Sequence, residues 1–269
     1  MTEAEMNEQI QAESEATVHW IEVTLVAYAI AQFGATRLQV NDILADFAKQ
    51  DGTIADNRVL SLLRKMDEID ADLRRIGEET ISDVVTRVSE RQVKTIAKAL
   101  RPFGDEIKEK AVVRETLKYV KAGAFSNDMP LSKRVWGVSG GITDRLRTEL
   151  RQGITRGESV NQLQKRVRGV YDAGTYPIRR LVVTEGNVAQ RKVTAESAKR
   201  SRVVAGLRIT DHPGHANHTE HRCYEMARED SYGLGVGVYP VDNEEVLKPH
   251  IQCTSTLSYV LKDEVTQVA

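Results

Sequence analysis

The late position of the first proline is the sequence feature that most constrains the fold of this chain. The 269-residue sequence has no proline before Pro102, and because proline breaks helix interiors, the first hundred residues are free to form long helices. An apolar stripe with alternating spacings of three and four residues supports this. It consists of Val59, Leu62, Met66, Ile69, Leu73 and Ile76. The spacing predicts one apolar helix face that continues less strictly to Leu100, and it favours an antiparallel helical pair.

Apolar periodicity predicts further helices on both sides of this stripe. Gly157 breaks one pattern, and Ser159 can cap the helix that follows. The turn-forming residues of 123–139 predict a connector and a domain boundary. The expected helices cover about 14–32, 40–49, 105–121, 139–154, 159–170 and 176–201.

The helical period stops after Arg202, and short strands are expected at 203–209, 236–239 and 251–260. The predicted fold is mainly α with a small β-containing C-terminal cap (α+β) and an elongated helical N-terminal region. The predicted parts are a helical N-terminal region at 1–125, a C-terminal domain of basic helices and a small β region at 139–262, and a tail at 263–269.

The net charge of −1 hides a strong segregation of charge. Residues 1–90 hold 8 Lys and Arg against 18 Asp and Glu, whereas residues 131–208 hold 17 against 6. The basic segment is either a set of solvated helix faces or a surface that meets DNA or an acidic protein. No stacking platform or helix-turn-helix is visible, so DNA contact would be non-specific. The candidate DNA-contacting residues are Arg145, Arg151, Arg166, Arg179 and Arg180.

The sequence predicts an intracellular protein without membrane insertion. Its most apolar segment, 20–33, is shorter than a membrane span and carries Glu22. The N-terminus is acidic where a secretory signal would be basic. The two cysteines are too few for a secreted disulfide framework.

Residues able to bind metal concentrate near the C-terminus. Five of the six histidines and both cysteines lie between residues 212 and 253. Imidazole and thiolate are the ligands that zinc prefers, so two separated His/Cys pairs predict a candidate zinc site. Its ligands would be His221, Cys223, His250 and Cys253. The spacing is not that of a standard zinc finger, and the cysteines could also be buried free thiols or a disulfide.

No established catalytic motif is visible. The chain lacks both a Gly-x-Ser-x-Gly elbow and a His-Glu-x-x-His helix, and Glu185 has basic neighbours that favour an ion pair. We therefore expect a protein that is not an enzyme. The alternative is a metal-dependent hydrolase or nuclease in which the histidines of 212–221 hold a metal that activates water.

The order of motifs over residues 95–262 resembles a known family. Gly157-Glu158-Ser159 starts a helix, Thr184-Glu185 is followed by Asn187 and Ala189, a His-rich loop leads to Cys223, and Pro249-His250-x-x-Cys253 precedes the last strand. This order is similar to that of the phage Mu F-like minor head proteins, the head-morphogenesis family of tailed bacteriophages.

The resemblance implies a minor capsid protein of the virion, synthesised in the host cytoplasm and located inside the phage head near the portal. It implies the portal protein as a partner, with capsid or scaffold protein and packaged double-stranded DNA as further candidates. The implied roles are head assembly, DNA packaging and DNA ejection. Residues 1–125 would then contain the portal-docking part.

Overall fold

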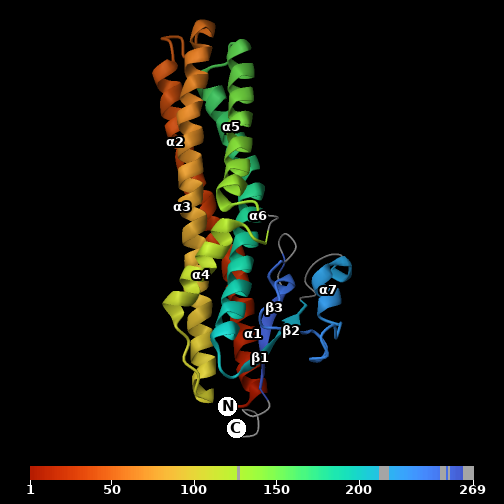
Figure 1. The fold of residues 1–269 in the computed structure, drawn as a ribbon. Coiled ribbons are helices and arrows are strands. Elements are labelled where there is room, and N and C mark those ends of the chain that lie inside the picture. Colours follow the sequence, from red (N-terminus) through yellow and green to blue (C-terminus); the bar gives the residue numbers. More distant parts are fainter. Residues whose placement is uncertain (126–127, 212–217, 249–252, 254, 263–269) are drawn as a thin grey trace. The chain divides into compact units, whose positions relative to one another are not determined.

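The computed structural model describes the chain except residues 126–127, 212–217, 249–252, 254 and 263–269. It is 74% helical, with one small three-stranded antiparallel sheet near the C-terminus of the part described (Figure 1). The predicted fold class, mainly α with a small β cap, is therefore confirmed.

The helices and strands follow one another along the chain as six long helices, two strands around a short helix, and a last strand. The helices are α1 (Glu3–Trp20), α2 (Val26–Phe47), α3 (Val59–Leu100), α4 (Glu109–Ala122), α5 (Leu131–Thr155), α6 (Val160–Arg200) and α7 (Arg222–Met226). A π-helical turn, Ile21–Leu25, separates α1 from α2. The strands are β1 (Val204–Thr210), β2 (Val238–Pro240) and β3 (Thr256–Leu261).

The chain forms two compact units, and neither is continuous in sequence. Unit 1 contains Met1–Thr24, Ser82–Pro130 and Val182–Ala269, and unit 2 contains Leu25–Ile81 and Leu131–Leu181. The predicted division into 1–125 and 139–262 differs from this one. The physical reason is that α3 and α6 each supply residues to both units, so the boundaries fall inside helices and not in a connector.

The predicted break between helices 159–170 and 176–201 is wrong. The structure has one helix, α6, that runs through Pro177. Proline inside a helix costs about 3 kcal/mol, but Val170, Gly174, Ile178 and Leu181 are all buried and keep one continuous packed face across this point. The break at Gly157 is confirmed, since this residue has a φ of 71°. Ser159 also caps α6 as predicted, because its Oγ accepts the N–H of Gln162.

Part of the predicted connector 123–139 is helical as well, because α5 begins at Leu131. Leu131, Val135 and Ser139 are buried, four residues apart. This repeat gives the first turns of α5 a buried face, although the glycine and proline residues nearby had predicted a connector.

Unit 2 contains an antiparallel pair formed by α2 and the first part of α3. Arg58 lies 4.4 Å over the ring of Phe47 near the turn, and further along the pair Phe33 packs against Gly77. Helix α5 is antiparallel to α3, because successive partners run in opposite directions along the two helices. These pairs are Asp67 with Arg147, Asp70 with Thr143, and Glu78 with Trp136.

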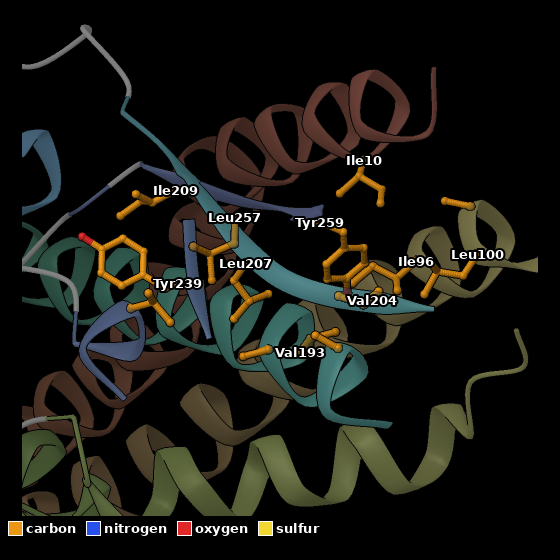
Figure 2. Close-up of a cluster of buried hydrophobic side chains, with 14 of the residues drawn as sticks. Ile10, Ile96, Leu100, Val193, Val204, Leu207, Ile209, Tyr239, Leu257 and Tyr259 are labelled. Carbon is orange, nitrogen blue, oxygen red and sulfur yellow. The ribbon is translucent and has the colours of Figure 1, made fainter. Parts of the chain in front are cut away.

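Unit 1 is built around the sheet, whose strand order is β2-β1-β3. Leu207 of β1 lies opposite Tyr239 of β2 and Tyr259 of β3. Figure 2 shows Ile10 of α1, Ile96 of α3 and Val193 of α6 in the same core as these strand residues, and all of them are buried. The sheet thus packs against the apolar faces of three helices and buries them.

The edge strand β3 is covered by α1. The side-chain amide of Asn7 donates to the Tyr259 carbonyl at 2.7 Å, and its oxygen accepts the Tyr259 N–H at 3.0 Å. Asn7 therefore supplies the two bonds that a neighbouring strand would make, which removes unpaired groups from this edge.

One helical run of the described residues is long and apolar enough to cross a membrane by length and composition. It is Glu3–Phe47, with an 18-residue window of mean hydropathy 1.2 that is 33% buried within the protein. Core helices of soluble proteins pass the same test, so the absence of membrane insertion stays a prediction.

Candidate functional site

A buried polar helix segment lies at the centre of the candidate site in unit 1. Residues 182–198 of α6 are buried except for half-buried Thr184 and Glu196. The buried set includes charged and amide side chains, which are rarely fully buried without partners. Its members are Glu185, Asn187, Gln190, Arg191 and Lys192.

Arg191 connects this segment to the C-terminal region, and only 3% of it is exposed. Its Nη1 donates to the carbonyl of Val246 at 2.8 Å, and its Nη2 donates to the carbonyl of Ser255 at 3.1 Å and to Cys253 Sγ at 3.3 Å. It also donates to the Ser255 hydroxyl. One cation thus fastens α6 to two separate stretches of the chain that follows it.

The two cysteines meet beside Arg191. Cys223 comes from α7 and Cys253 from the segment before β3, and their sulfurs lie 3.6 Å apart without a disulfide bond between them. Both residues are buried, at 6% and 1% exposure. The hydroxyl of Ser255 lies 2.9 Å from Cys253 Sγ. The side chain of Asn187 donates to the Cys253 carbonyl, so α6 contacts this residue through two side chains.

The environment makes Cys223 a poor nucleophile. The pKa of the Cys223 thiol is raised well above its usual range, mainly by its hydrogen bond with Cys253 and secondly by its burial. Nucleophilic attack and metal ligation both need the thiolate. The folded arrangement therefore keeps the proton on Cys223 at neutral pH.

The structure describes three of the four predicted zinc ligands. Cys223 and Cys253 come together as predicted, and His221 directly precedes α7 and is half-buried. His250, the fourth predicted ligand, lies outside the described residues. Within the described ranges, no group of three or more His, Cys, Asp or Glu residues could hold a metal ion. Two sulfurs fit half of a tetrahedral site, so zinc stays a prediction.

The candidate DNA-contacting arginines all lie in unit 2, and they differ in exposure. Arg145, Arg151, Arg179 and Arg180 are exposed. Arg145 lines an open groove of about 530 Å³ between α5 and α6. Exposed guanidinium groups on two neighbouring helices are the kind of surface that attracts phosphate.

Arg166 has a different role from the other four. It binds Glu158 through Nε at 2.6 Å and Nη2 at 2.7 Å, and it also binds Glu149. These contacts raise the pKa of Arg166 and lower the pKa of Glu158. The Arg166 side chain is only 22% exposed. We therefore interpret Arg166 as a residue that links α5 to the start of α6 through ion pairs, and we leave it out of the DNA-contacting face.

Sequence reasoning missed Arg191 and Ser255. Arg191 falls within the basic segment, where most cations are expected to be solvated. Its neighbours give one usable signal, since Val188, Val193 and Ala195 surround it with apolar positions on several helix faces. A cation that has apolar positions on several sides of its helix is expected to be buried and to need internal acceptors.

No family model, curated protein or solved structure matches this chain.

Proposed function

We propose that this chain is a non-enzymatic structural protein of the head of a tailed bacteriophage, located inside the virion near the portal. The proposal starts from the motif order described above. The observation that carries it is that separated motif residues meet in one buried cluster: Asn187 holds the carbonyl of Cys253, and Cys253 contacts Cys223. Motif residues that contact one another inside a core stabilise the fold, which is what a structural protein requires.

The bonding within this cluster favours a structural role over turnover. Arg191 directs its donors to backbone carbonyls, a hydroxyl and a thiol of the protein itself. The pKa of Cys223 is raised, which suppresses the nucleophilic thiolate. A catalytic centre needs polar groups that converge on a site open to substrate. These groups instead converge on one another and hold two segments onto a helix.

The charge distribution supports two partners. Residues 1–90, with 18 acidic against 8 basic side chains, suit docking to a basic surface of a protein ring such as the portal. The exposed arginines of α5 and α6 suit the phosphate backbone of packaged double-stranded DNA. Capsid or scaffold protein is a further candidate partner. Together these contacts would serve head assembly and DNA packaging or ejection.

Quantitative mass spectrometry of purified phage particles tests the location. We expect about a few to a dozen copies per particle, measured relative to the portal protein. The copy number is limited because a single portal ring offers few binding sites. We also expect the protein to be lost from particles assembled without the portal. Absence from both procapsids and mature particles would refute the proposal.

Charge reversal on α5 tests the DNA contact. Arg145→Glu with Arg151→Glu should weaken binding to a short DNA duplex about tenfold and lower the slope of log K against log salt by about two, because two phosphate contacts are lost. Fluorescence anisotropy over a salt series measures both quantities.

The matched control for this experiment is Arg64→Glu with Lys65→Glu on α3. Both residues are exposed and lie in the same unit, and the change in net charge is identical. We expect this control to change the salt slope little, since α3 carries acidic neighbours such as Asp67 and Glu68. Equal losses in both variants would show that only net charge matters. Metal-dependent cleavage of the duplex would instead favour a nuclease.

A further inference from the structure

We propose that Cys223 and Cys253 form a reversible dithiol–disulfide site that is oxidised by low-molecular-weight disulfides such as glutathione disulfide. The inference rests on the geometry of unit 1 alone and does not depend on the proposed function. From the sequence alone, the two cysteines could be thiols, a disulfide or metal ligands. The proposal assigns them a reversible disulfide.

The positions of the two sulfurs favour bond formation. They lie 3.6 Å apart, and a disulfide bond is about 2.05 Å long, so about 1.5 Å of approach closes the pair. Cys223 sits in a single short helix, α7, and Cys253 in the segment before β3. We expect a shift of α7 to supply this approach, because neither cysteine lies in one of the paired strands.

The polar groups around the two sulfurs make them unequal. Arg191 Nη2 donates to Cys253 Sγ at 3.3 Å, and the Ser255 hydroxyl lies 2.9 Å from the same sulfur. A neighbouring cation and a hydroxyl donor both favour a thiolate. The contact of Cys223 Sγ is with the other sulfur. Because Arg191 and Ser255 both contact Cys253 Sγ directly, we assign the first attack on the incoming disulfide to Cys253.

The oxidation balances with one equivalent of glutathione disulfide. The Cys253 thiolate attacks one sulfur of that disulfide, forms a mixed disulfide and releases a glutathione thiolate, which takes up a proton. In the mixed disulfide, Cys223 no longer has the Cys253 thiol as its partner. The Cys223 thiol loses its proton, its sulfur attacks the Cys253 sulfur, and the second glutathione leaves as a thiolate that takes up that proton. Two protein thiols are oxidised, and one glutathione disulfide is reduced to two thiols.

Burial sets the rate of this exchange. With 6% and 1% exposure, neither sulfur meets a reagent until α7 opens locally. We therefore expect slow formation of the disulfide and slow reduction once it has formed. The bond would join residues 30 positions apart and would link α7 to the segment before β3, with β2 inside the closed loop.

The test equilibrates the full-length protein with glutathione disulfide and then measures thiols and mass after denaturation. We expect both thiols to be lost and the intact mass to fall by about 2 Da, the mass of two hydrogen atoms, with the Cys223–Cys253 bond found by peptide mapping. The oxidised protein should melt about 5 °C or more above the reduced protein. Dithiothreitol should restore both thiols and the original melting temperature.

The single variants Cys223→Ser and Cys253→Ser serve as controls, and each should take up one glutathione and show no gain in melting temperature. Persistence of both free thiols at equilibrium, or a wild-type product that carries only glutathione adducts or links two chains, would overturn the proposal. The same samples, purified without chelator, are analysed for zinc by mass spectrometry. One zinc per chain, whose removal is needed before any thiol reacts, would also overturn it in favour of the metal site.

Discussion

Replacing Arg191 with methionine should lower the free energy of unfolding of unit 1 by about 3–5 kcal/mol. Methionine keeps much of the side-chain volume, so a cavity is not the main cause. The loss arises because the carbonyls of Val246 and Ser255 stay buried without the donors that Arg191 provides. Each unsatisfied buried acceptor costs about 1–3 kcal/mol, and relief of the buried cation offsets only part of that sum.

Urea unfolding followed by circular dichroism measures this effect, with two comparison variants. Arg191→Lys keeps the charge but cannot reach both carbonyls from one nitrogen, so we expect an intermediate loss. Arg200→Met is the matched control on the same helix, because the Arg200 side chain is 35% exposed and its partner is the carboxylate of the half-buried Glu196. A loss below about 0.5 kcal/mol is expected there. Equal effects of Arg191→Met and Arg200→Met would contradict the assigned role of Arg191.

The second large effect is expected at Gly77 in unit 2. A Cβ atom on Gly77 would lie 2.6 Å from Val135 Cγ1 and 2.8 Å from Phe33 Cζ. Both neighbours are fully buried, so neither can move into open space. Gly77→Ala should therefore destabilise unit 2 by about 1–3 kcal/mol through overpacking, although alanine favours a helix by about 1 kcal/mol over glycine.

A double-mutant cycle separates these two contributions. Phe33→Leu shortens the side chain that would meet the new methyl group, so Gly77→Ala should cost less in that background. Gly137→Ala is the matched control, because Gly137 lies on α5 of the same unit and no neighbouring side chain comes within 4 Å of the place where its Cβ atom would lie. It should stabilise by about 0.5–1 kcal/mol. Additive effects of Gly77→Ala and Phe33→Leu in thermal unfolding would refute the close packing.

Local patterns in the sequence were sufficient for most of the fold. The stripe from Val59 to Ile76 lies on α3, and the glycine at 157 with the capping serine at 159 marks the start of α6. All three strands were also expected near their positions. Periodicity, caps and turn residues act over a few positions, so a single sequence carries them directly.

Long-range packing decided what the sequence did not show. The helix through Pro177 depends on burial by other helices, and the boundaries of the two units fall inside α3 and α6. In the candidate site, the proximity of Cys223 and Cys253 was expected, but Arg191 was not, because its acceptors lie 55 and 64 residues further along the chain. No local spacing encodes such a contact.

The pairing of Asn7 with Tyr259 has a consequence for biosynthesis. The two residues are 252 positions apart, and β3 is bonded to β1 on one side and to the Asn7 amide on the other. While the ribosome is still translating the region before β3, α1 has no strand to cover and the sheet lacks one of its edges. Unit 1 therefore reaches its native arrangement only after β3 has left the ribosome. Until then the apolar face of α1 lacks the strand that covers it in the folded protein.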